Sequence, residues 1–128
     1  MFSHVTVGAN DLEASKTFYD AIVGALGGGK GVLDEKGRVM YTHNGGRLGV
    51  TRPIHGGDVI PSNGGTIGFL ADSPEVVDAW HAAGLANGGT AIEDPPGIRH
   101  APGGRVLYLA YLRDPAGNKL CGFHKISG

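Results

Sequence analysis

The order of secondary-structure signals in this chain occurs twice, and this repeat is the feature that most constrains the fold. The glycine pairs that end the two expected helices, Gly27-Gly28 and Gly88-Gly89, begin at positions 27 and 88. The two expected first strands start near His4 and Thr66. The two glycine pairs and the two strand starts are each separated by about sixty residues, and this shared spacing indicates an internal duplication. Neither half could bury both faces of a small sheet alone, so we expect the two halves to pack together.

The first half predicts a strand, a helix and three short strands. Asn10 or Asp11 is placed to cap the helix, and Asn10 with Glu13 has the spacing of a capping box. An apolar stripe at helical spacing follows, made of Leu12, Tyr19, Ile22 and Leu26. The expected strands cover residues 2–8, 31–34, 38–43 and 47–52.

The second half repeats this order. A helix is expected after Asp72 or Ser73, with Pro74 in its first turn, a place that suits proline, and Gly84 at its end. The segment 95–104 is rich in proline and glycine and is predicted to be a long loop. The expected strands cover residues 66–71, 90–93, 105–112 and 118–124.

These signals predict one domain over residues 1–128 with an α+β fold. Module one covers about 1–52, the segment 53–63 is a linker, and module two covers about 64–126. Two such βαβββ modules form a curved, partly open mixed sheet with the helices on its convex side. The concave side is then a cup, which is where ligands bind.

Composition excludes several classes of protein. The formal net charge is −1, so nothing favours nucleic acid or an anionic membrane surface as a partner. No apolar run approaches the roughly 20 residues that span a bilayer, and the N-terminus does not have the pattern of a signal peptide. The single cysteine allows no intrachain disulfide and fits a reducing, cytoplasmic location.

Two motifs point to a known family. The first is H-x-x-V-x-x-x-D-L-x-x-S-x-x-F-Y, from His4 to Tyr19, and the second is R-D-P-x-G-N-K-L, from Arg113 to Leu120. The second motif supplies a turn between two apolar runs. In this order and about one hundred residues apart, the motifs resemble those of the vicinal oxygen chelate superfamily of glyoxalases, bleomycin-resistance proteins and extradiol dioxygenases. The resemblance implies paired βαβββ modules and a homodimer.

The resemblance also implies where a metal would be held. Metal-dependent members of the superfamily place His, Glu or Gln on the first and last strand of each module, where a divalent ion acts as a Lewis acid on substrate oxygens. The matching positions here are His4, Gly49, Thr66 and Cys121. Only His4 keeps a usual ligand, although Cys121 could bind a soft ion as a thiolate. Because a catalytic site usually needs three protein ligands, we expect no complete metal site.

Several residues remain candidates for a site in the cup. His4 is a candidate acid or base, or else a hydrogen-bonded residue of the cup floor, and Thr66 and Cys121 are candidate ligand contacts. A lone buried cysteine such as Cys121 is more often a small apolar residue of the core. Tyr108 offers a ring and a hydroxyl if it faces inward. His100, which follows Arg99, could reach over the cup mouth and meet an anionic ligand.

The sequence therefore predicts a protein that binds a small organic molecule in the cup without a complete metal site, as bleomycin-resistance proteins sequester their ligand. Two alternatives stay open. One is a metal-free lyase or isomerase that moves protons with His4 and a tyrosine. The other is a metal-dependent lyase, similar to lactoylglutathione lyase, or a dioxygenase with other ligands. The sequence alone names neither the ligand nor a reaction.

Overall fold

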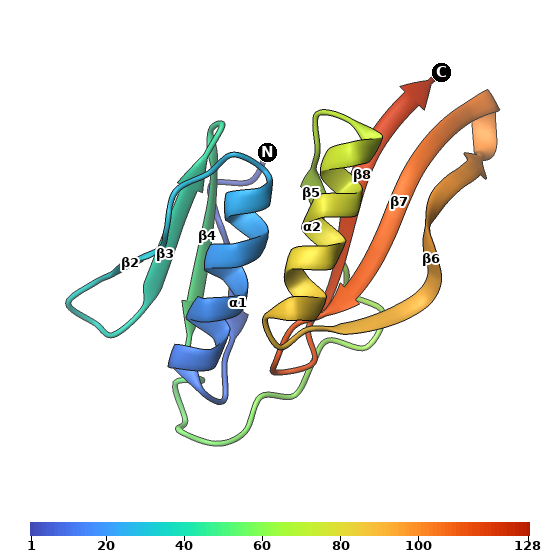
Figure 1. Cartoon of the computed structure of the whole chain (residues 1–128). Coiled ribbons are helices and arrows are strands. Elements are labelled where there is room, and N and C mark those ends of the chain that lie inside the picture. The colour runs from blue at the N-terminus through green and yellow to red at the C-terminus, as the bar shows by residue number, and fades with distance from the viewer.

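The computed structural model describes all residues from Met1 to Gly128 and contains two βαβββ modules, as the repeat predicts (Figure 1). Module one consists of β1 (Val5–Gly8), α1 (Leu12–Ala25), β2 (Val32–Leu33), β3 (Val39–His43) and β4 (Gly46–Thr51). Module two consists of β5 (Ile67–Leu70), α2 (Pro74–Ala86), β6 (Thr90–Ala101), β7 (Arg105–Arg113) and β8 (Lys119–Ser127), with a 3₁₀ turn at Pro102–Gly104. The α+β prediction is confirmed.

Each module forms a four-stranded mixed sheet with the same topology. The strand orders are β1-β4-β3-β2 and β5-β8-β7-β6, with β1 parallel to β4 and β5 parallel to β8. The two sheets stand next to each other, and α1 and α2 lie side by side across the same face (Figure 1). We call this the helix face and the opposite side the open face. The inner edge strands β1 and β5 define the seam between the modules.

The hydrophobic core lies between the helices and the sheets. Both helices bury one stripe against strand residues of both modules, which join into one cluster. The largest fully buried side chains in it are Trp80, Tyr19 and Phe18. Because successive strand residues point to opposite faces, the neighbours of the core residues on each strand point to the open face. No helix in this structure combines the length and apolarity needed to cross a bilayer.

The predicted loop 95–104 is wrong for most of its length. β6 runs unbroken from Thr90 to Ala101 and pairs antiparallel with β7. The ladder is interrupted by a bulge between Ile92 and Gly97, where Glu93 has φ of 58°. Two prolines sit inside this bulge, and an edge strand accepts prolines because one side of it donates no ladder hydrogen bond.

The helix boundaries differ from the prediction at two residues. Asp11 caps α1 by accepting from the Ala14 amide at 3.1 Å, so the capping box of Asn10 is wrong. The Asn10 side chain instead accepts a hydrogen bond from the Val59 amide in the linker at 2.7 Å. Ser73 caps α2, but the helix continues past Gly84. Gly84 is a buried residue of this helix. Glycine is needed there because a Cβ would collide with Leu112 of β7.

Candidate functional site

The two sequence motifs meet in space and form a buried hydrogen-bond network. The Tyr19 hydroxyl in α1 donates to Asp114 Oδ2 at 2.6 Å. Asp114 Oδ1 accepts from the Ala116 and Asn118 amides at 2.9 Å each. The Asn118 side-chain amide donates to Asp114 Oδ2 at 2.8 Å and to the Gly8 carbonyl at 2.9 Å. The network fixes the 114–118 turn of module two on α1 and β1 of module one, so we assign these motif residues a structural role.

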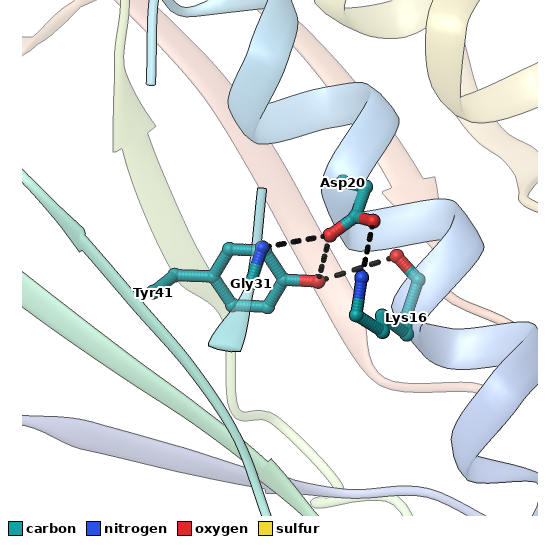
Figure 2. Close-up of polar contacts among 4 residues, drawn as sticks. All are labelled: Lys16, Asp20, Gly31 and Tyr41. Atoms are coloured by element: carbon teal, nitrogen blue, oxygen red, sulfur yellow. Dashed lines mark hydrogen bonds and ion pairs between the residues drawn. The ribbon is translucent and has the colours of Figure 1, made fainter. Parts of the chain in front are cut away.

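A second network fixes the residue before β2 and the middle of β3 on α1. Asp20 lies at its centre, and Figure 2 shows Lys16, Gly31 and Tyr41 converging on its carboxylate. Asp20 Oδ1 accepts from the Tyr41 hydroxyl at 2.8 Å and from the Gly31 amide at 2.9 Å, and Lys16 Nζ lies 2.7 Å from Oδ2. Partial burial raises the pKa of Asp20, but the hydrogen bonds from Lys16, Gly31 and Tyr41 outweigh this, so the pKa falls below its usual 3.8.

The two networks predict a loss of stability at alkaline pH. Burial first, and then the neighbouring carboxylates Asp114 and Asp20, raise the pKa values of Tyr19 and Tyr41 well above the usual 10.0. Below the usual tyrosine pKa of 10.0, both hydroxyls are protonated in the folded and the unfolded chain, and their full contribution to the free energy of unfolding is present. Above pH 10 these two hydroxyls ionise only in the unfolded chain. The free energy of unfolding should therefore fall by about 1.4 kcal/mol per pH unit for each tyrosine.

Urea denaturation between pH 8 and pH 11 measures this slope, and the Y19F and Y41F variants should each show a shallower one. Tyrosine ionisation in the native protein can be followed by ultraviolet absorbance. If all tyrosines ionise together near the usual pKa, the prediction is contradicted.

The largest cavity lies on the open side of the seam and has a volume of about 960 Å³. We call it the main cavity. The end of β1 at Gly8, the start of β5 at Thr66 and the linker line it together. Hydroxyl groups from Thr6, Thr51 and Thr66 add hydrogen-bonding capacity to the strand side. The main cavity is therefore built from both modules, as the predicted cup requires.

The linker forms one wall of the main cavity. Most of the residues between Arg52 and Ser62 line it, and the linker is anchored by the hydrogen bond between the Val59 amide and Asn10. Val59 also packs on the backbone of Gly8, where a Cβ would lie only 2.9 Å from the Val59 Cγ2 methyl. A side chain at position 8 would push the linker outward and change the shape of the cavity.

The lining of the main cavity contains more cations than carboxylates. It has four permanent cations, Lys36, Arg38, Arg52 and Lys119, and one carboxylate, Asp58. Such an excess of one charge in a concave site concentrates ligands of the opposite charge.

The four cations differ in what already holds them. Arg38 is paired with Asp34 at 2.7 Å, and Lys119 is paired with Glu93. Lys119 also lies 4.9 Å from the ring centre of Tyr111. Lys36 and Arg52 form no ion pair in this structure. These two side chains are exposed and can turn toward an incoming anion without losing a protein partner.

Of the candidate site residues His4, Thr66, Tyr108, Cys121 and His100, Thr66 alone lines the main cavity. His4 is exposed, and its Nδ1 lies 2.8 Å from the Ser3 hydroxyl oxygen. His4 precedes β1, whereas the cavity is lined by the far end of that strand and by the start of β5. His4 and Thr66 therefore lie toward opposite ends of the seam.

Cys121 points to the open face of β8 but is buried with Leu107 and Leu109. Its thiol lies 3.5 Å from the Gly122 carbonyl. Burial raises the pKa of the Cys121 thiol, which keeps it protonated near neutral pH. A protonated, buried thiol is a weak nucleophile and a weak metal ligand.

Tyr108 and His100 are placed away from the cup. The Tyr108 hydroxyl donates to Asp78 of α2 at 2.8 Å, so this side chain lies on the helix face. His100 belongs to β6 and not to a loop, and it pairs with Val106. Because residues opposite each other in antiparallel strands share a face, His100 lies on the same face as Tyr108.

The residues at the implied metal positions do not fit a divalent ion. Gly49 has no side chain, Thr66 lines the main cavity, Cys121 is a buried thiol and His4 is bonded to its neighbour. Nowhere in the structure do three His, Cys, Asp or Glu side chains gather closely enough to hold a metal ion. We therefore derive no chemical step through a metal.

Because these residues do not fit a metal ion, we expect a chelator to leave the melting temperature of the protein unchanged. Dialysis against EDTA should not alter the melting temperature, and added Ni²⁺, Zn²⁺ or Mn²⁺ should not raise it, because ions that bind only the folded state raise it by mass action. Differential scanning calorimetry measures both effects. Stoichiometric metal in the purified protein that is lost in an H4A variant would contradict the prediction.

Sequence reasoning missed the cations of the main cavity. Lys36 lies in a predicted turn, Arg38 and Arg52 lie at the ends of predicted strands, and none of the three belongs to a motif. Lys119 lies inside the second motif, which was interpreted through its turn. The one usable signal is that all four cations lie at or near the end of a predicted strand, where side chains from different strands gather.

Comparisons with known proteins agree with the fold. A family model described as the Glyoxalase/Bleomycin resistance protein/Dioxygenase superfamily matches residues 1–121. A crystal structure of a glyoxalase/bleomycin resistance protein from Albidiferax ferrireducens is 57% identical, with a TM-score of 0.92, and the match covers 97% of this chain and 98% of that one. No curated protein sequence is similar enough to this chain to match it.

More distant structures share the fold alone. A lactoylglutathione lyase from Agrobacterium tumefaciens is 24% identical with a TM-score of 0.63, and the match covers 96% of this chain and 92% of that one. A glyoxalase/bleomycin resistance protein/dioxygenase family enzyme from Burkholderia phytofirmans is 18% identical with a TM-score of 0.69, covering 94% and 95%. At these identities the resemblance extends to the arrangement of the modules and not to the chemistry.

Proposed function

Because this chain belongs to the Glyoxalase/Bleomycin resistance protein/Dioxygenase superfamily, whose fold supplies a cup, we propose that it binds a small anionic organic molecule in the main cavity. The observation that carries the proposal is the charge of the lining, in which Lys36 and Arg52 have no ion-pair partner and Asp58 is the one carboxylate. The ligand class is a carboxylate or phosphate ester with a compact body. A cavity of about 960 Å³ is in the range that holds such molecules.

The two unpaired cations support this choice of ligand. Charge-assisted hydrogen bonds from arginine to carboxylate or phosphate are about twice as strong as neutral ones. Arg52 can form such a bond without breaking an existing ion pair, and Lys36 adds a second point charge. The hydroxyls of Thr6, Thr51 and Thr66 can bind the remaining polar groups of the ligand.

Binding without chemistry is supported over acid–base catalysis. The alternative of a metal-free lyase or isomerase requires His4 and a tyrosine beside the ligand. Neither His4 nor any tyrosine is among the residues that line the main cavity. His55 in the linker does line it, but its Nδ1 accepts a hydrogen bond from the Gly57 amide at 2.9 Å.

Matched pairs of ligands test the proposal. A panel of aromatic and aliphatic carboxylic acids and phosphate monoesters is compared with the corresponding amides and neutral esters by thermal shift. The acids should raise the melting temperature, and each neutral partner should raise it less, because stabilisation depends on the ratio of ligand concentration to Kd. Equal shifts for the acid and the neutral member of each pair would contradict the proposal.

A further inference from the structure

A polar pocket of about 480 Å³ lies beside the main cavity, and we call it the rim pocket. It is formed by the last part of the linker and by the two strand ends of the β7–β8 hairpin. Residues 61–65, Arg113 and Lys119 line it, and no carboxylate is among them. Ser62, Gly65 and Lys119 also line the main cavity, so the two spaces adjoin each other.

Two cations of the rim pocket face each other at a cost to stability. Arg113 ends β7, Lys119 begins β8, and the two residues are direct partners in the antiparallel ladder. Such partners share a face, and like charges placed directly opposite each other are destabilising. The neighbour of Arg113 on its other side is Thr90 of β6, which carries no charge. Folding therefore gives no reason for this pair of cations, whereas an anion bound between them does.

Arg113 is the free cation of the rim pocket, and Lys119 is shared. Glu93 pairs with Lys119 from the bulge of β6, where its φ of 58° is uncommon for a residue other than glycine. Arg113 is exposed and forms no ion pair. Its Nη1 donates to the Gly117 carbonyl at 2.7 Å, which orients the guanidinium and leaves its other donors for a ligand. The neighbouring Asp114 carboxylate is buried and already accepts four hydrogen bonds.

The linker closes the rim pocket with a tight turn. Gly64 has φ of 90°, and a Cβ at Gly65 would lie only 2.6 Å from Ser62 Oγ, so the turn needs glycine at both places. The Gly64 amide donates no backbone hydrogen bond. Pro61 packs on Gly117 of the β7–β8 turn, where a Cβ would lie 3.0 Å from the Pro61 Cγ. Because the buried network described above fixes that turn, this wall of the rim pocket is held in place.

We propose that the rim pocket binds a phosphate group. A phosphate presents several oxygen acceptors, so Arg113, Lys119 and the Ser62 hydroxyl can each bind a different one. A carboxylate has only two oxygens and would leave part of these donors unused. The inference rests on the function proposed for the main cavity and narrows its ligand class. The ligand is a small acid that carries a phosphate as a second acidic group, with its first acidic group at Arg52.

Inorganic phosphate tests the rim pocket without an organic body. At constant ionic strength, phosphate should shift the amide signals of Ser62, Gly64 and Arg113 in ¹H–¹⁵N spectra, with a Kd in the millimolar range, and acetate should shift them less. The R113Q variant should bind phosphate about five- to tenfold more weakly. The E93Q variant should bind it about two- to fivefold more tightly, because Lys119 loses a competing carboxylate. A folding defect would not produce this gain.

The R105Q variant is the matched control. Arg105 is an exposed arginine of the same strand, and it lines neither the main cavity nor the rim pocket. R105Q should therefore bind phosphate like the wild type. Phosphate shifts confined to residues around Arg52 and Lys36 would overturn the inference, as would equal losses of affinity in R113Q and R105Q.

Short phosphorylated hydroxy acids separate this inference from the proposed function. Isothermal titration compares each of them with its parent acid, which lacks the phosphate. R113Q should weaken only the phosphorylated acids, whereas R52E should weaken the parents as well. If R52E weakens both and R113Q changes neither, the main-cavity proposal stands and the inference is wrong. If R113Q weakens the phosphorylated acids and R52E changes nothing, the rim pocket binds phosphate and the proposed function is wrong.

Discussion

Replacing Asp114 with alanine is expected to lower the free energy of unfolding by about 3–5 kcal/mol. The Asp114 side chain is buried and accepts hydrogen bonds from Tyr19, from Asn118 and from two backbone amides of its own turn. Its removal leaves the Tyr19 hydroxyl without a partner in the core and releases the turn that joins the two modules. Urea denaturation followed by circular dichroism measures the loss.

Two further variants show whether the network carries this effect. Tyr19→Phe removes one hydrogen bond and keeps the ring in the core, so it should cost about 1.5–3 kcal/mol. Asp72→Ala removes an exposed carboxylate that forms no hydrogen bond, and it should change stability by less than about 0.5 kcal/mol. A loss below about 1 kcal/mol for D114A would contradict a network that holds the modules together.

Reversing the charge of Arg52 is expected to weaken the binding of an acidic ligand to the main cavity by about 10- to 100-fold, which corresponds to about 1.4–2.8 kcal/mol. The variant removes the unpaired arginine and adds a second carboxylate beside Asp58. Because Arg52 is exposed and has no protein partner, R52E should keep the stability of the wild type. Isothermal titration with the best acid of the ligand panel measures the change.

Arg105→Glu is the matched control for net charge. Arg105 is exposed and does not line the main cavity, so R105E changes the total charge by the same amount at a distant place. The two variants should therefore differ strongly in affinity for the acid and little in affinity for its amide. Equal losses in R52E and R105E would mean that the whole protein attracts the ligand and the main cavity does not hold it.

Most of the fold followed from the sequence because both modules carry strong local signals. Ser73 with Pro74 gave the start of α2, and the offset between the glycine pairs gave the order of elements in both modules. The start of β6 was predicted as a strand over residues 90–93, but its continuation to Ala101 was missed because its two prolines indicate a loop, whereas an edge strand with a bulge accepts them. Asn10 was misassigned because its partner, Val59, is 49 residues away, and local spacing cannot show a long-range hydrogen bond.

The candidate site was less accessible to sequence reasoning. Thr66 was found because a family position could be carried over to it, and it lines the main cavity. Arg52 and Lys36 were missed because their common location depends on how the linker and the β2–β3 turn fold over the seam. Tyr108 was taken as a ligand contact, but the alternation of faces along β7 directs it to Asp78. The homodimer and the cytoplasmic location stay predictions.

The most direct test of the central claim is a crystal structure of the protein with the tightest-binding acid of the ligand panel. The account predicts the acidic group in the main cavity, between Gly8 and Thr66, within hydrogen-bonding distance of Arg52 or Lys36. An acid bound elsewhere, or bound through a metal ion that protein side chains hold, would contradict it.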